Sequence, residues 1–197
     1  HGLARRLEFA LVSSSDTSIT YSLKANDKTK EQYPYDFELQ MTYELTEHGV
    51  KVSHTVINHD SVVMPYCVGG HPAFNCPVFE NESFEDYIVE FEQPENAACA
   101  QLTEDRLINN ADRVSVLENE AVIPVRHSLF YKDALVFDAL KSRKVALKHK
   151  KTGHGILVSF PDFDYLGVWS SANDGPFVAL EPWSGTSTCS DEDDVFE

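Results

Sequence analysis

The sequence has 197 residues, which is enough for one domain with a sizeable core. Hydrophobic residues make up 42% and aromatic residues 11%, a composition that is typical of globular proteins and excludes a disordered chain. The formal net charge of −16 disfavours nucleic acids and anionic membranes as partners, because both repel an anionic surface. No apolar run approaches the roughly 20 residues that span a bilayer. A neutral small molecule is therefore the expected kind of ligand.

The ends of the sequence and its cysteines indicate the context of the chain. The sequence begins with His1 rather than Met and ends within an acidic run, so we expect a fragment of a longer protein, incomplete at both ends. The four cysteines are irregularly spaced and form no CxxC pair, which excludes the usual zinc patterns. Free thiols in a reducing cytosol are the expectation, and we predict a cytoplasmic location.

The first half of the chain contains the clearest strand pattern. Residues 36–45 alternate strictly between polar and apolar, which predicts a strand with one buried face. A hairpin turn is expected at 46–49, where Gly49 accepts a positive φ, and a return strand follows to about Asn58. Residues 25–30 are expected to form a polar turn or loop.

Several shorter strands are expected in the second half. Residues 145–149 and 155–160 read as a hairpin around a turn at 151–153, and Pro124 suggests that the extended stretch 120–125 lies at a sheet edge. Residues 93–110 read as a loop with one weakly helical or irregular part. The remaining expected strands are 87–91, 134–137, 166–170 and 177–180. With no convincing 3.6-residue period, the chain is predicted to be an all-β sandwich or barrel, in a single domain over 1–197.

The segment Gly69–Asn75 places a histidine after two glycines and before a proline. Glycine tolerates backbone angles that other residues avoid and permits close approach to a ligand. Pro72 pushes His71 away from helical geometry and towards an extended or turn conformation. His71 is therefore expected in a stiff loop at the end of a strand, where its imidazole can serve as a general acid or base. A structural histidine beside a tight turn is the alternative.

A second motif is Leu180–Gly185, in which Glu181 follows an apolar run. A carboxylate at the end of a buried strand is costly unless it has partners or a chemical role. Pro182 constrains its backbone, and Trp183 offers an aromatic face. Flat aromatic surfaces beside fixed polar groups suit a sugar, whose C–H faces are apolar and whose hydroxyls need directional partners. The alternative is a strand-end glutamate that caps a turn.

Other ionisable residues allow two interpretations each. His1 and Arg5 either contribute to a site or belong to a frayed end, and Asp133 either binds ligand or ends a turn. Four histidines in turns or polar ends are expected to be solvated: His48, His59, His149 and His154. A cupin-like metal site needs an HxH pair, which the sequence lacks, and the GxSxG and glycine-rich nucleotide motifs are also absent.

Taken together, Gly69–Asn75 and Leu180–Gly185 resemble the aldose 1-epimerase (galactose mutarotase-like) family, and most of all its bacterial LacX-like branch. The segments His1–Arg5, Tyr33–Phe37 and Val56–Asn58 resemble softer motifs of that family. The resemblance implies an all-β fold, a twisted antiparallel β-supersandwich, and a reaction without a cofactor. Family members usually carry additional strands before the His-Gly segment and after the acidic run.

The resemblance also implies a function and a set of site residues. The implied reaction is the interconversion of α and β anomers of a free aldohexose, with His71 as general acid and Glu181 as general base. Side chains with ordinary pKa values of about 6.5 and about 4.3 suit these roles. His1, Arg5 and Asp133 would hold sugar hydroxyls, and Trp183 would wall the pocket. The expected partner is a small sugar, and the expected state is a monomer or homodimer.

Two other functions stay open at this point. One is a non-catalytic carbohydrate-binding β-sandwich, since a fold alone does not decide function. The other is a hexose-6-phosphate 1-epimerase, which needs a basic cluster near the pocket. Arg5 and Arg6 are the only adjacent arginines that support it.

Overall fold

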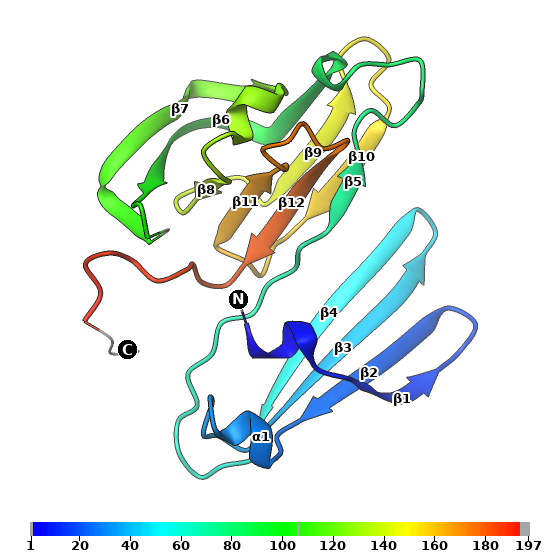
Figure 1. The fold of residues 1–197 in the computed structure, drawn as a ribbon. Coiled ribbons are helices and arrows are strands. Elements are labelled where there is room, and N and C mark those ends of the chain that lie inside the picture. The colour runs from blue at the N-terminus through cyan, green and yellow to red at the C-terminus, as the bar shows by residue number, and fades with distance from the viewer. Residues whose placement is uncertain (1, 106, 194–197) are drawn as a thin grey trace. The chain divides into compact units, whose positions relative to one another are not determined.

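The computed structural model describes residues 2–105 and 107–193 (Figure 1). The chain divides into two compact units, His1–Tyr66 and Cys67–Glu197. The described elements are strands apart from four short helical turns, and all pairings between the named strands are antiparallel, so the predicted all-β antiparallel fold is confirmed. The single-domain organisation stays a prediction. No helix in the described part of the chain has the length and apolar character needed to cross a membrane.

The first unit is an antiparallel sheet whose strands follow one another in chain order. The hairpin predicted around residues 46–49 is confirmed, because Phe37–Thr46 pairs along its full length with Gly49–Asn58. Leu23, Phe37 and Met64 form the buried centre of this unit. Its elements are η1 (Leu3–Arg6), β1 (Ala10–Ser14), β2 (Ser18–Lys24), α1 (Asp27–Lys30), β3 (Phe37–Thr46) and β4 (Gly49–Asn58).

The second unit contains two four-stranded sheets, in the orders β10-β9-β6-β7 and β5-β12-β11-β8. A shared core joins the sheets, and the rings of Phe91 and Phe137 meet across it with centroids 5.4 Å apart. All four cysteines of the chain are free thiols, as expected. The elements are β5 (Ala73–Asn75), η2 (Phe84–Asp86), β6 (Tyr87–Leu102), β7 (Ile108–Pro124), η3 (His127–Phe130), β8 (Leu135–Phe137), β9 (Lys144–His149), β10 (Gly155–Ser159), β11 (Tyr165–Trp169) and β12 (Phe177–Trp183).

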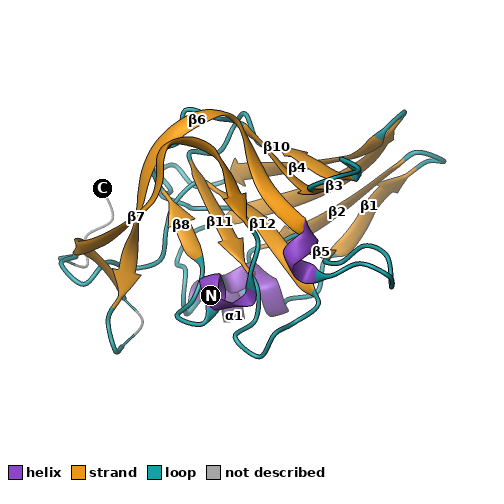
Figure 2. Cartoon of the chain, turned by 90° about the horizontal axis from the view of Figure 1, so that it is seen from above, coloured by secondary structure: helices purple, strands orange, loops and turns teal. Residues whose placement is uncertain are grey.

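The prediction of a loop over 93–110 is wrong. Most of this stretch belongs to β6 and β7, which form a long curved ribbon with several register shifts (Figure 2). Such shifts break the alternation of polar and apolar residues that reveals a strand in a sequence. Glu95 adds a charge in mid-strand, but it is only 1% exposed and accepts hydrogen bonds from the backbone and hydroxyl of Ser142. Pro124 does lie in an edge strand, β7, as predicted.

The sheet that contains β12 has two different faces. Leu166, Val168, Val178 and Leu180 point into the core, as expected for alternate residues of two paired strands. The other face carries the intervening residues. In the register of β8, β11 and β12, Val136 lies opposite Gly167, which lies opposite Glu181. The next row pairs Tyr165 with Trp183, so this second face carries the predicted site residues of β12.

Candidate functional site

The backbone around His71 runs alongside β12. The Gly70 N–H donates to the Pro182 carbonyl at 3.0 Å, and the Leu180 N–H donates to the Pro72 carbonyl at 3.1 Å. These two hydrogen bonds flank the residue pair and place His71 beside Glu181. The extended conformation that Pro72 favours is what allows this pairing.

His71 and Glu181, which the sequence analysis singled out separately, lie next to each other. The Nδ1 atom of His71 is 3.5 Å from Oε1 of Glu181. Glu181 is buried, with its side chain 6% exposed, whereas the His71 side chain is 50% exposed. A buried carboxylate is tolerated when it has polar partners, and a half-exposed imidazole can still meet a ligand from solvent.

Two glycines make room for the indole ring of Trp183. A Cβ added to Gly69 would lie 2.5 Å from Cδ1 of that ring, and one added to Gly167 would lie 2.8 Å from Cζ2. The indole therefore runs across β12, from the segment that carries His71 to β11. It also borders Glu181, whose Cβ would be 3.4 Å from the same added atom at Gly167. The first glycine of the Gly69-Gly70 pair is thus explained by packing.

Trp169 is a site neighbour that the sequence analysis did not identify. Its ring meets the imidazole of His71 nearly at right angles, with centroids 5.6 Å apart. It belongs to the same sheet face as Glu181, because Trp169 and Gly167 are alternate residues of β11. The period-two pattern of 165–169, read against that of 177–183, would have placed it there.

Asp133 has a different setting. Its φ of 150° is unusual for a residue with a side chain, and its Oδ1 accepts a hydrogen bond from the Ala134 N–H at 2.7 Å. It lines a hollow of about 410 Å³ together with Asp112 and Lys132. The lining of that hollow does not include His71 or Glu181. A role for Asp133 in binding sugar stays a prediction.

The two predicted residues of the amino end also stay predictions. His1 lies outside the described residues. Arg5 is exposed and lies in η1, a turn of 3-10 helix in the first unit, where it is followed by the exposed Arg6.

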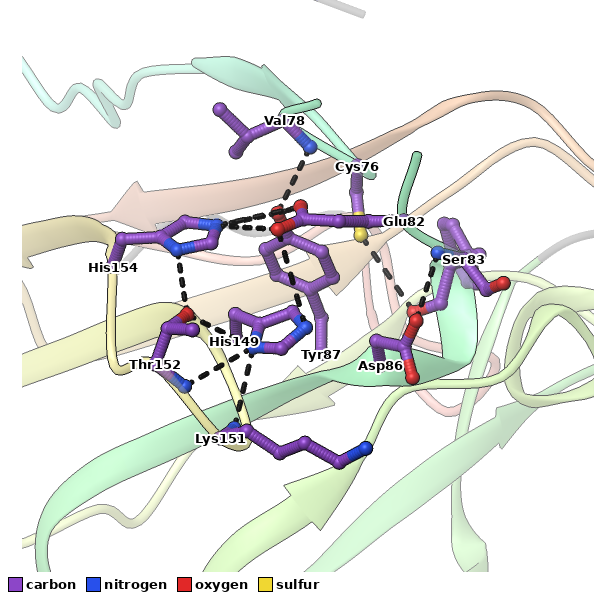
Figure 3. A network of polar contacts seen from close by, with 11 residues as sticks. Cys76, Val78, Glu82, Ser83, Asp86, Tyr87, His149, Lys151, Thr152 and His154 are labelled. Carbon is purple, nitrogen blue, oxygen red and sulfur yellow. Dashed lines mark hydrogen bonds and ion pairs between the residues drawn. The ribbon is translucent and has the colours of Figure 1, made fainter. Parts of the chain in front are cut away.

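A second polar cluster in the second unit consists of Glu82, His149 and His154, whose ligand-type atoms lie within 4.8 Å of one another (Figure 3). The prediction that His149 is solvated is wrong, because this residue is only 8% exposed. It is the last inward-facing position of β9, after Val145 and Leu147, so the alternation along that strand predicts its burial.

The hydrogen bonds of His149 argue against a role as metal ligand. The backbone N–H groups of Lys151 and Thr152 both donate to its Nδ1, each at 3.2 Å. An imidazole whose Nδ1 accepts carries its proton on Nε2, and Nε2 is the atom that faces Glu82. A histidine that binds a metal through Nε2 would instead donate from Nδ1. The arrangement of this cluster therefore fits a network of hydrogen bonds better than a metal site.

Glu82 is the acceptor at the centre of this network (Figure 3). Its carboxylate accepts from the Tyr87 hydroxyl and lies 3.2 Å from Nε2 of His154. Burial opposes ionisation, but the hydrogen bond from Tyr87 and the nearby His154 together lower the pKa of the Glu82 carboxyl. Burial and the Glu82 carboxylate raise the pKa of Tyr87 to about 12. The network ties the β9–β10 turn to the segment before η2.

The comparisons with known proteins agree with the fold and the motifs. The family model for aldose 1-epimerase matches residues 1–193. The chain is 41% identical to the chromosomal protein LacX of Lactococcus lactis subsp. lactis over 199 residues, which cover all of this chain and 67% of LacX. The plasmid form of LacX matches equally well.

Two solved structures share the fold. A galactose mutarotase related enzyme from Lactobacillus acidophilus has a TM-score of 0.90 and 29% identity over 98% of this chain. A galactose mutarotase-like protein from Lactobacillus casei has a TM-score of 0.84 and 30% identity over 94% of this chain. The chain spans 64% of each of these two proteins. The predicted galactose mutarotase-like fold is confirmed, and the chain belongs to the aldose 1-epimerase family.

Proposed function

We propose that this chain accelerates the interconversion of the α and β anomers of a free aldohexose. The observation that supports the proposal most is the 3.5 Å separation of His71 Nδ1 and Glu181 Oε1 on a sheet face with two indole rings. Membership of the aldose 1-epimerase family supports the same class of reaction. The cytoplasmic location and the monomer or homodimer state remain predictions.

The proposed reaction begins with opening of the sugar ring. The Glu181 carboxylate takes the proton of the hydroxyl on C1, while protonated His71 gives a proton to the ring oxygen. The bond between C1 and the ring oxygen breaks, and C1 becomes the carbonyl carbon of an open-chain aldehyde. Each of the two proton transfers contributes roughly 10²–10⁴-fold to the rate.

Ring closure reverses both transfers. The aldehyde end rotates about the C1–C2 bond, so the hydroxyl group that was formed from the ring oxygen attacks the other face of the carbonyl. His71 takes back the proton of that hydroxyl, and Glu181 returns its proton to the oxygen on C1. Both residues end in their starting protonation states, so the cycle needs no co-reactant. Trp183 is proposed as the wall against which the apolar face of the sugar packs.

The test is the rate at which freshly dissolved α-glucose reaches anomeric equilibrium, followed by polarimetry or NMR with and without the protein. The proposal expects acceleration that is proportional to protein concentration. Binding of glucose in a calorimeter without acceleration would select the carbohydrate-binding alternative. Stronger acceleration with glucose 6-phosphate than with glucose would select the hexose-6-phosphate alternative.

A further inference from the structure

The strand β10 lies at an edge of the second unit. In the part of the chain that the structure describes, the two sheets of this unit end in β10, β7, β5 and β8. An exposed strand edge can pair with a strand of another chain, and proteins protect such edges by shortness, charges, prolines or an irregular register. The protection of each edge therefore indicates which of them is open to a partner.

Three of these four edges are protected. β5 and β8 have three residues each. β7 has several register shifts against β6, carries the exposed charges of Asp112, Glu118 and Glu120, and ends at Pro124. By contrast, β10 has five residues in continuous register with β9, and none of them is charged or a proline. Among the described strands of the second unit, β10 is thus the unprotected edge.

Hydrogen bonds just beyond the two ends of β10 show which of its backbone groups point outward. The His154 carbonyl accepts from the His149 N–H at 2.8 Å, and the Phe160 N–H donates to the Arg143 carbonyl at 2.8 Å. Successive residues of an antiparallel strand turn their backbone groups alternately to one side and to the other. Since His154 and Phe160 face the β9 side, the residues at odd positions between them face the open edge. These are Gly155, Leu157 and Ser159.

The side chains at this edge are apolar and exposed. Ile156 lies opposite the core residue Leu147 of β9, yet it is 41% exposed. Leu157, on the other face of the sheet, is 62% exposed. Phe79 extends the apolar surface, because it is 54% exposed and its ring lies 5.0 Å from that of His154, centroid to centroid. Contiguous apolar surface of this kind is typical of a protein interface.

A second copy of the chain fits this edge, because β10 is complementary to itself. When Leu157 lies opposite Leu157 of another copy in antiparallel orientation, Ile156 of each copy lies opposite Val158 of the other. The outward backbone groups of Leu157 then exchange hydrogen bonds with their counterparts, and those of Gly155 do so with Ser159. One two-fold axis satisfies both copies, as in most protein dimers.

The charges on either side of β10 fit the same arrangement. Lys150 and Lys151 precede the strand, Asp162 and Asp164 follow it, and all four are exposed. Antiparallel pairing about Leu157 brings the basic end of each copy to the acidic end of the other. Parallel pairing would instead bring like charges together. Complementary charges of this kind fix the orientation of two partners.

We propose that this chain forms a two-fold symmetric homodimer in which the β10 strands of two copies pair in antiparallel orientation about Leu157. The β10-β9-β6-β7 sheet of one copy then continues into that of the other. The dimer buries the apolar side chains of Phe79, Ile156 and Leu157. The inference does not depend on the proposed function.

The test is sedimentation velocity over a roughly hundredfold range of protein concentration, since dimers form by mass action. We expect the wild type to dimerise. Leu157→Lys places two like charges opposite each other on the axis, so it should raise the dissociation constant roughly 100-fold or more. Leu11→Lys is the matched control, because Leu11 is 59% exposed in β1, an edge strand of the first unit. This variant should dimerise like the wild type.

Charge swaps test the orientation of the two strands. Lys151→Glu and Asp162→Lys should each weaken the dimer roughly tenfold, because each change acts twice in a symmetric dimer. The variant with both changes should recover the wild-type dissociation constant. Recovery of this kind cannot come from a folding defect, so it keeps the test valid even if Leu157→Lys unfolds.

Three results would each overturn the inference. The first is a wild-type chain that stays monomeric over the whole concentration range, and slow hydrogen exchange of the Leu157 amide in that monomer would assign the edge to another segment of the protein. The second is a dimer that persists in Leu157→Lys, with circular dichroism that matches the wild type. The third is a dimer that Leu11→Lys dissociates, because the contact would then lie in the first unit.

Discussion

His71 Nδ1 lies 3.5 Å from Glu181 Oε1, although the two residues come from segments far apart in the chain. On either side of the pair, a backbone hydrogen bond from Gly70 to Pro182 and another from Leu180 to Pro72 hold the two segments together. The pair therefore does not depend on long, flexible side chains that reach towards each other. An arrangement set by paired backbones is the kind of preorganisation that acid–base catalysis needs.

Gly167→Ala is expected to damage the site through Trp183. The added Cβ would lie 2.8 Å and 2.9 Å from two atoms of the indole, so either the ring or β11 must shift. We expect a loss of about 1–3 kcal/mol in the free energy of unfolding, as overpacking usually costs, and a lower rate of mutarotation. Urea unfolding followed by tryptophan fluorescence measures the first effect. Gly49→Ala is the control, since no atom lies within 4 Å of its added Cβ; equal behaviour of the two variants would refute the packing role.

Trp169 is expected to position the His71 ring. An edge-to-face aromatic contact contributes about 0.5–1.5 kcal/mol, so Trp169→Leu should lower kcat by roughly 2- to 12-fold. Trp169→Phe keeps an aromatic ring and should restore most of the loss. Rates for both variants, together with their melting temperatures, separate positioning from folding. A leucine variant that melts like the wild type and keeps its full kcat would exclude this role for Trp169.

Much of this arrangement follows from the sequence, because local rules apply. Strict alternation over 36–45 correctly predicted β3. The glycines and prolines around His71 and Glu181 indicated extended segments, and the structure pairs these two segments. The nearness of the two motifs came from the family resemblance, since nothing local in either segment encodes which strand it pairs with.

Other features depend on contacts that the sequence does not reveal. The charged residue Glu95 made the sequence of β6 look unlike a strand. Its hydrogen bonds with Ser142, which is distant in the chain, explain why Glu95 can be buried in that strand. Trp169 could have been assigned to the site face from alternation, but its contact with His71 needs the sheet order. Glu82 and His154 are also far apart in the sequence, and their 3.2 Å contact depends on how the β9–β10 hairpin packs against the segment before η2.

Glu82→Gln is expected to destabilise the second unit in a pH-dependent way. The folded-state pKa of this carboxyl is lowered from its ordinary value of 4.5, so the folded state binds fewer protons than the unfolded state in that range. The stabilisation is present above about pH 4.5 and is lost as the pH falls through the lower folded-state pKa. The melting temperature of the variant should thus lie below that of the wild type at pH 7, and the difference should shrink towards pH 3.

Glu47→Gln is the matched control for this prediction, because the Glu47 side chain is 88% exposed beside an equally exposed His48. This variant should melt like the wild type at both pH values. A constant difference between Glu82→Gln and the wild type from pH 7 to pH 3 would contradict an ionised Glu82 at the centre of the network.

The most direct test of the central claim is the rate constant for conversion of α-glucose to β-glucose, measured by NMR at pH 7 for wild type, His71→Ala, Glu181→Gln and the double variant. Residues that act as one unit give strongly non-additive losses. Each single variant should therefore lose roughly 10²-fold or more, and the double variant should lose little beyond that. His48→Ala, a change at an exposed histidine, should keep the wild-type rate. Full activity in either folded single variant would contradict the account.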